Sequence, residues 1–230
     1  MTLLIAIEGI DGSGKGTQST RLVERLCESG LSAARMQFPR YSDTSFGTAI
    51  GDFLNGKFGD LDTVHPQLAA VLYAGDRFES KAELESTLQS HDVLVLDRYT
   101  GSSLAHQGAK LEGEARAQLL QWIDHMEHTV FQLPRPQLNI LIDITSDWSQ
   151  ELVGRKAARD YTDQKADIQE ADQSYLERVR SSYRELAAAR DDWTVVQSLC
   201  DGELRDVEDI NAELLSLITP LVGRRPSDSA

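Results

Sequence analysis

The sequence predicts an α/β fold in which a central parallel sheet is covered by helices on both faces. Short apolar runs alternate along the chain with longer amphipathic stretches. A continuous apolar run of about five residues is typical of a strand that is buried on both faces, as the strands of parallel sheets are. Helices between such strands supply the crossover connections that a parallel sheet requires.

Three apolar runs predict the central strands, and they lie at 3–7, 92–99 and 137–144. Two further strands are expected at 34–38 and 193–199. The remaining amphipathic stretches predict helices over 15–28, 45–56, 65–90, 113–128, 147–158, 167–190 and 203–222. Gly30 is expected to stop the first of these helices. We expect Trp122, Trp148 and Trp193 to be packing anchors.

Length and composition limit the class of protein. The chain has 230 residues, which predicts a single domain over 1–222 and a frayed polar tail over 223–230. A net charge of −14 predicts repulsion of polyanions, so we expect no nucleic acid polymer and no acidic membrane as partner. The apolar N-terminal run is too short for a signal peptide or a membrane span. We expect a cytoplasmic protein in which Cys27 and Cys200 are buried, reduced thiols.

A glycine-rich loop separates the first predicted strand from the first helix. It has the G-x-x-x-x-G-K spacing of a phosphate-binding loop, or P-loop, between Gly9 and Lys15. Its glycines let consecutive N–H groups point at an anion, and the lysine reaches the terminal phosphates. A ligand-free turn is the alternative, which the lysine and the strand–loop–helix context disfavour. The residues expected to bind ATP are Gly9, Asp11, Gly12, Ser13, Gly14, Lys15, Gly16 and Thr17.

The loop departs from the usual motif at one position. Gly16 stands where a serine or threonine normally helps to hold Mg²⁺, and Thr17 comes one residue later. We expect carboxylates and water to hold the metal instead. Asp11 lies inside the loop, and Asp97 ends a predicted strand at the edge where ligands bind in open parallel sheets. These two residues are the candidate Mg²⁺ ligands.

The rest of the sequence favours a kinase over other nucleotide-binding proteins. A GTPase would also carry an Asn-Lys-x-Asp segment that reads guanine, and the sequence has none. A motor usually needs a longer chain. We therefore predict a P-loop kinase with a central parallel sheet and a small lid over about 150–167.

Five segments, in this order, resemble the thymidylate kinase family, and its actinobacterial branch in particular. They are "EGIDGSGKGTQ" (8–18), "FPRY" (38–41), "YAGDR" (73–77), "DRYTGSSLAHQG" (97–108) and "GRKAARD" (154–160). The resemblance covers the chain to about residue 220. It implies transfer of a phosphoryl group from ATP to dTMP, with Mg²⁺ as cofactor and a homodimer as the assembly.

The resemblance also implies roles for individual residues. Phe38 would stack on the thymine ring, Arg77 would contact its carbonyl edge, and Asp11 would accept a hydrogen bond from the sugar hydroxyl. The residues expected to act in the transfer are Lys15, Asp97, Arg98, Arg155 and Arg159. The residues expected to bind dTMP are Asp11, Phe38, Tyr41, Tyr73, Arg77, Arg98, Ser103, His106, Gln107, Asp167 and Glu170.

Two positions keep alternatives open. Actinobacterial relatives have an asparagine and a tyrosine where this chain has Ser103 and His106, and Gln107 is a possible replacement for the missing amide. Another nucleoside monophosphate is therefore an alternative acceptor. Gly16 leaves a second alternative, a nucleotide-binding regulatory module with little catalysis.

Overall fold

A computed structural model describes residues 2–59, 63–154 and 173–222. Its centre is a parallel sheet of five strands in the order β2-β3-β1-β4-β5. The strands are β1 (Leu3–Glu8), β2 (Ala33–Gln37), β3 (Val93–Asp97), β4 (Leu138–Asp143) and β5 (Trp193–Gln197). The five predicted strands and the parallel arrangement are therefore confirmed.

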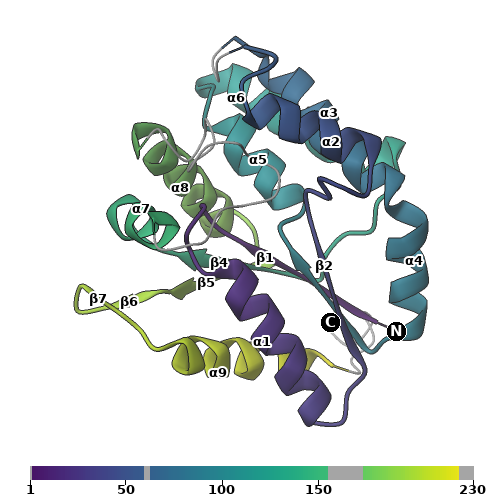
Figure 1. The fold of residues 1–230 in the computed structure, drawn as a ribbon, viewed down its shortest axis with the longest axis vertical. Coiled ribbons are helices and arrows are strands. Elements are labelled where there is room, and N and C mark those ends of the chain that lie inside the picture. Colours follow the sequence, from purple (N-terminus) through teal and green to yellow (C-terminus); the bar gives the residue numbers. More distant parts are fainter. Residues whose placement is uncertain (1, 60–62, 155–172, 223–230) are drawn as a thin grey trace.

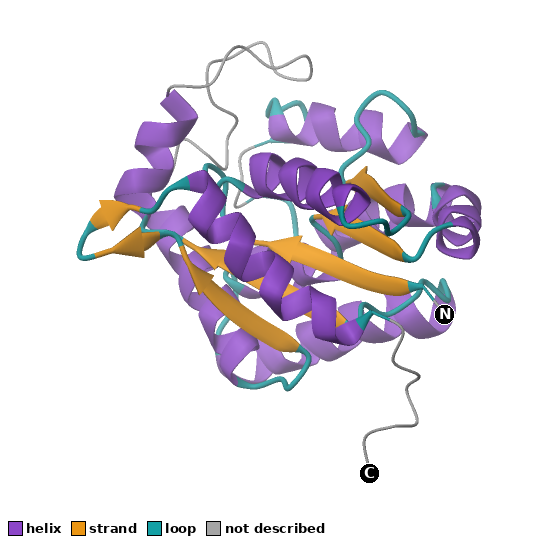
Figure 2. Ribbon diagram, turned by 90° about the horizontal axis from the view of Figure 1, so that it is seen from below, coloured by secondary structure: helices purple, strands orange, loops and turns teal. Residues whose placement is uncertain are grey.

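Helices cover both faces of the sheet (Figure 1). One face carries α1 (Lys15–Glu28) and α9 (Val207–Ile218). The helices on the opposite side are α2 (Ser45–Leu54), α3 (Pro66–Glu79), α4 (Lys81–Ser90), α5 (Thr100–Gly108), α6 (Gly113–His125) and α8 (Gln173–Ala188), and α7 (Ser146–Gly154) lies beside α8. Figure 2 shows the sheet between these two layers.

The alternation of side chains along β1 explains why this strand is a continuous apolar run. Leu3, Ile5 and Ile7 pack into the core beneath α1 and α9, whereas Leu4 and Ala6 pack into the core on the other face. All of these side chains are buried because helices lie on both sides. A strand between two helical layers needs apolar residues at every position, which removes the usual polar alternation.

The chain leaves the sheet in opposite directions after two neighbouring strands. The helix that follows β1 is α1, on one face, while the helix that follows β3 is α5, on the other. The register pairs Ile7 with Asp97, so both strands end at the same edge. Ligands bind in the crevice that such a divergence leaves. The P-loop and the 97–108 segment meet at this crevice.

The structure corrects two expectations. Cys27 and Cys200 are exposed, since each lies on the outward side of its element. The predicted helix over 203–222 begins later, because residues 199–204 form a hairpin of β6 (Leu199–Cys200) and β7 (Glu203–Leu204) that projects from the body (Figure 2). Asp201 and Gly202 have positive φ angles of 52° and 85°, which suit a tight hairpin turn.

Smaller departures concern the ends of helices. The stretch 65–90 is divided at Ser80 into α3 and α4, and α6 continues as a π-helical segment, η1 (Met126–Val130). A 3₁₀ turn, η2 (Thr219–Leu221), follows α9. Gly30 has a φ of 91° just past α1, as expected of a helix stop. Trp193 lies in the core and Trp122 and Trp148 pack against it. Among the described residues, no helix is both long and apolar enough to cross a membrane.

Candidate active site

The loop between β1 and α1 has the backbone of an anion-binding turn. Gly9, Gly12 and Gly14 have φ angles of 146°, 76° and 89°, which residues other than glycine rarely adopt. A Cβ at Gly12 would also collide with the backbone of Ser149. Lys15 is buried at the start of α1, and its Nζ donates to the carbonyl oxygen of Ile10 at 2.7 Å. The lysine is therefore folded over its own loop.

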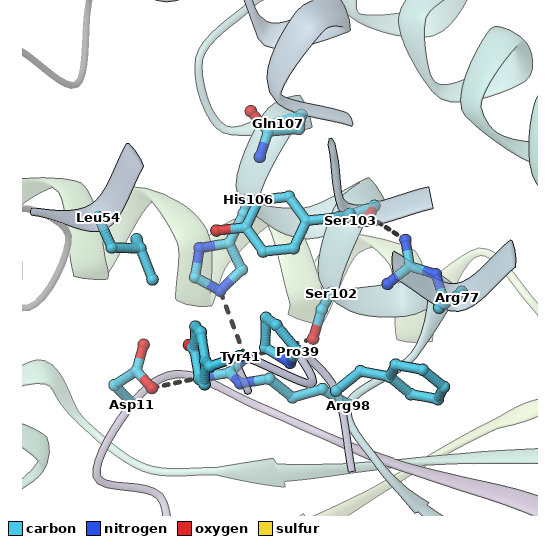
Figure 3. Close-up of a pocket in the computed structure, with 12 residues that line it drawn as sticks. Asp11, Pro39, Tyr41, Leu54, Arg77, Arg98, Ser102, Ser103, His106 and Gln107 are labelled. Carbon is cyan, nitrogen blue, oxygen red and sulfur yellow. Dashed lines mark hydrogen bonds and ion pairs between the residues drawn. The ribbon is translucent and has the colours of Figure 1, made fainter. Parts of the chain in front are cut away.

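Two adjoining cavities open at the crevice. The first, here called the acceptor cavity, is lined by Asp11, Phe38, Pro39, Tyr41, Leu54, Tyr73, Arg77, Arg98, Ser102, Ser103, His106 and Gln107 (Figure 3). The second, here called the P-loop cavity, shares Asp11, Phe38, Pro39, Tyr41 and Arg98 with it and adds Gly12, Gly14, Lys15, Gly16, Gln37 and Asp97. Most of the predicted site residues are thus brought together.

Arg98 lies where the two cavities meet. Its Nη2 donates to Asp11 Oδ1 at 2.6 Å, and its Nη1 donates to the carbonyl oxygen of Gly9 at 3.1 Å and to Ser102 Oγ at 3.2 Å. The residue itself has a φ of 66°, a left-handed conformation that is strained for arginine. The strained backbone aims the guanidinium back over the P-loop.

A buried carboxylate holds this arrangement. Glu8 is the last residue of β1 and is inaccessible to solvent. It accepts hydrogen bonds from the Tyr99 N–H at 2.9 Å, from Ser102 Oγ at 2.6 Å and from Tyr183 Oη at 3.1 Å. Burial raises the pKa of Glu8, while these donors oppose that rise. A Cβ at Gly101 would lie 2.8 Å from Glu8 Oε1, so only glycine fits there.

Sequence analysis missed the role of Glu8. The available signal was a carboxylate at the end of an otherwise apolar strand, directly before a P-loop. Such a group has to find donors when it is buried. Because two of its donors follow Arg98 by one and four residues, Glu8 fixes both the strained backbone and a hydrogen-bond partner of the guanidinium.

The far end of the acceptor cavity contains a second arginine. Arg77 donates from Nε and Nη2 to the two carboxylate oxygens of Glu127, at 2.8 Å and 2.6 Å. Its Nη2 also donates to Ser103 Oγ at 2.6 Å. Thr100 completes the cluster by donating to Glu127 at 2.7 Å. Arg77 therefore lines the cavity with its charge balanced by Glu127, which lies in η1 and which sequence analysis did not single out.

Gln107 is a residue of the acceptor cavity whose buried polar atoms lack partners among the described residues. Its side chain is inaccessible to solvent, and neither Oε1 nor Nε2 has a hydrogen-bond partner among the residues that the structure describes. Figure 3 shows the side chain at the wall of the acceptor cavity. An unsatisfied buried amide is costly, so its presence at a cavity points to a ligand that pairs with it.

His106 lies between the two ends of the acceptor cavity. Its Nε2 faces Arg98 Nη1 at 3.5 Å, and its Nδ1 lies 3.2 Å from Tyr175 Oη. Burial, followed by the positive charge of Arg98, lowers the pKa of His106 to about 3. The ring is therefore neutral at physiological pH. The neighbouring arginine can only donate, so we assign the ring proton to Nδ1.

Aromatic side chains complete the cavity. Phe38 is buried, packs 6.0 Å from the Tyr99 ring between centroids, and lines both cavities. It is therefore both a core residue and a wall of the site. Tyr41 and Tyr73 are half-buried and line the acceptor cavity. Thr17 is exposed on α1.

The predicted metal ligands lie close to the P-loop. Asp11 and Asp97 both line the P-loop cavity, each in an ion pair, Asp11 with Arg98 and Asp97 with Arg35. No group of three or more His, Cys, Asp or Glu side chains suited to a metal occurs among the described residues. Mg²⁺ is commonly held by one or two carboxylates together with water and substrate phosphates, so this donor pair fits it.

Four predicted site residues, Arg155, Arg159, Asp167 and Glu170, and most of the predicted lid lie outside the described residues.

Comparisons with known proteins agree on one family. A model of the family described as thymidylate kinase matches residues 7–208. A thymidylate kinase of Mycobacterium tuberculosis is 32% identical over 187 residues, which are 81% of this chain and 86% of that protein. A probable thymidylate kinase of Thermococcus onnurineus is 30% identical over 94% of this chain and 97% of its own length.

A solved structure supports the same fold. The thymidylate kinase of Candida albicans superposes with a TM-score of 0.72, covers 96% of this chain and 92% of its own chain, and is 24% identical. At this identity the likeness establishes the fold alone.

Proposed function

The chain belongs to the thymidylate kinase family, and we propose that it transfers the γ-phosphoryl group of ATP to dTMP at the two adjoining cavities. One observation carries the proposal. The P-loop lysine lines one of the two adjoining cavities, Arg98 lines both, and the other is lined by a buried amide that has no partner among the described residues. This arrangement suits a ligand with a charged phosphate at one end and a planar, hydrogen-bonding base at the other.

The transfer requires no nucleophile from the protein. A phosphate oxygen of dTMP attacks the γ-phosphorus, the bond from that phosphorus to the bridging oxygen of ADP breaks, and the products are dTDP and ADP. Catalysis is then mainly a matter of positioning and charge neutralisation. Lys15 supplies positive charge at the P-loop, and Arg98 supplies it between donor and acceptor.

The base end of the acceptor cavity suits thymine. The Gln107 amide offers one acceptor and one donor, which complement the N3–H and the neighbouring carbonyl of the base. Phe38 offers an aromatic face for stacking. Arg77 and Ser103 form a rigid, charge-balanced wall beside them. His106, held neutral, would border the sugar without adding charge.

The remaining components of the proposal come from the sequence. Bound Mg²⁺ would neutralise phosphate charge, with Asp11 and Asp97 as the side chains that hold it. Arg155 and Arg159 would bring further positive charge from the lid, and Asp167 and Glu170 would lie near the sugar. We also propose a cytoplasmic homodimer. Exposed apolar side chains on α3, Leu68 and Phe78, support a contact between copies, which light scattering would test.

An ADP-release assay tests the function. ATP and Mg²⁺ are supplied with dTMP, dUMP, dCMP, dGMP, UMP or ribothymidine monophosphate in parallel, and a Lys15→Ala variant serves as the control for contaminating kinases. A strong preference for dTMP is the expected result. Preference for another monophosphate would retain the kinase and change its acceptor. Nucleotide binding without turnover on any acceptor would favour the regulatory module.

A further inference from the structure

Arg35 is an arginine beside the P-loop that sequence analysis did not single out. It lies on β2, and its Nη2 donates to Asp97 Oδ2 at 2.6 Å and to Gln37 Oε1 at 3.0 Å. Its Nε donates to Ser19 Oγ on α1 at 2.7 Å. The side chain is 25% exposed, and that of Asp97 is 14% exposed. Three partners thus fix the guanidinium, and two of them, Gln37 and Asp97, line the P-loop cavity.

This position coincides with the departure in the loop motif. A Cβ at Gly16 would lie 3.4 Å from Asp97 Oδ2 and 3.9 Å from Arg35 Nη2. In P-loop proteins with serine or threonine at this position, that hydroxyl and a strand-end aspartate together hold Mg²⁺. Here the hydroxyl is missing, the strand-end carboxylate of Asp97 remains, and the cation next to it is Arg35.

We propose that Arg35 is a positioning residue of the donor site: it neutralises Asp97 and so lets the P-loop cavity bind nucleotide phosphates without Mg²⁺. The inference rests on the proposed function, because it takes ATP and ADP as the ligands of this cavity. Arg35 is a fixed positive charge of the protein, and bound Mg²⁺ would add further positive charge at the same site.

The charges around the cavity explain the effect. Among the described residues, the charged side chains that line the P-loop cavity are Lys15, Arg98, Asp11 and Asp97, which balance one another. Arg35 adds one positive charge directly behind this lining, through its ion pair with Asp97. Without Arg35, Asp97 would lose this ion pair and one positive charge would be missing beside the phosphates. Repulsion at such short range, in a partly buried site, weakens binding by about tenfold or more. Mg²⁺ would offset this loss by binding between the carboxylate and the phosphates.

Calorimetric titration with ADP tests the proposal, once in EDTA and once in saturating Mg²⁺. Arg35→Met removes the charge and keeps the stem. We expect it to weaken metal-free binding about tenfold and Mg²⁺-loaded binding by less than about threefold. Asp97→Asn should strengthen metal-free binding, and the double variant should return to within about threefold of wild type. Arg116→Met is the matched control, since Arg116 is 24% exposed, pairs with Glu185 and lies outside both cavities.

Each result has a defined meaning. Equal weakening by Arg35→Met in both conditions, or weakening no larger than that of Arg116→Met, would overturn the role of Arg35. Wild-type protein that binds ADP only with Mg²⁺ would also overturn it, while leaving the kinase intact. Absence of ADP binding in both conditions would overturn the proposed function and this inference together. If Arg35→Met does not fold, Asp97→Asn decides alone, because unchanged metal-free binding in that variant contradicts the proposal.

Discussion

Two arginine–carboxylate pairs at opposite ends of the acceptor cavity have nearly the same geometry and very different surroundings. Arg98–Asp11 and Arg77–Glu127 each have an N–O distance of 2.6 Å. The side chains of the first pair are 14% and 21% exposed, whereas those of the second are 2% and 0% exposed. Both arginines were predicted to bind the same substrate.

The difference in burial separates a pair that exchanges partners from one that does not. A partly exposed pair is in contact with water, so an incoming phosphate can replace the carboxylate at modest cost. A fully buried pair has lost its hydration, and removal of one partner leaves an uncompensated charge in the interior. We therefore assign the phosphate chemistry to Arg98 and a framework role to Arg77 and Glu127.

The largest expected effect is a loss of activity when the partly exposed pair, Arg98–Asp11, is broken. Arg98→Ala should lower kcat/KM for dTMP by about 10³-fold, because it removes a charge-assisted donor at the transferring phosphoryl group. Its unfolding free energy should change by only about 1–2 kcal/mol. Steady-state kinetics and urea unfolding measure the two quantities. Arg98→Lys, which keeps the charge without the planar fork, should be intermediate, and near wild-type activity in Arg98→Ala would contradict the assignment.

The next effect concerns stability at the buried pair. Glu127→Gln should lower the unfolding free energy by about 3–5 kcal/mol, since the buried charge of Arg77 would lose its ion-pair partner. Urea unfolding provides the measurement. Glu83→Gln is the matched control because it also breaks an Arg–Glu pair, but one whose glutamate is exposed, and it should change stability by less than ~1 kcal/mol. Equal losses in the two variants would remove the distinction.

Two smaller effects, a gain in stability and a loss of affinity, are expected on replacing Gln107. Gln107→Met keeps the volume and removes two buried polar atoms that have no partner among the described residues. The variant should be more stable by about 1 kcal/mol and should bind dTMP about tenfold more weakly. Thermal unfolding and dTMP titration report the two changes, with the exposed Gln89→Met as control. A loss of stability together with unchanged affinity would show that the amide serves the fold.

The effect that is smallest near neutral pH concerns His106. The pKa of His106 falls from an ordinary 6.5 to about 3 on folding, so the unfolded chain binds more protons between these values. The stabilising contribution is present above pH 6.5 and is lost as the pH falls toward about 3. Wild-type stability should therefore decline on acidification by about 1 kcal/mol per pH unit more steeply than that of His106→Asn. Urea unfolding at several pH values measures both slopes. Equal declines of the unfolding free energy in wild type and His106→Asn would contradict the lowered pKa of His106.

The sheet and the P-loop follow from local patterns of residues. Apolar runs and glycine spacing are patterns within a few neighbouring residues. These patterns predict the strands around 3–8, 93–97 and 138–143 and the loop from Gly9 to Lys15. Local signals also placed Asp97 and Arg98 at a strand end facing the crevice. They failed for residues 199–204, where a hairpin precedes the helix, and for the two cysteines, whose exposure depends on what packs against each element.

Which charges meet depends on contacts between distant parts of the folded chain. Arg77 pairs with Glu127 across 50 residues, Arg98 with Asp11 across 87, and Arg35 with Asp97 across 62. Such partners are chosen by packing and by the need of each buried polar group for a hydrogen bond, and no short-range pattern encodes that choice. The role of Glu8 was not predicted for the same reason. Its donors are Tyr99 and Ser102, which follow β3, and Tyr183 on α8, and folding brings them to the end of β1.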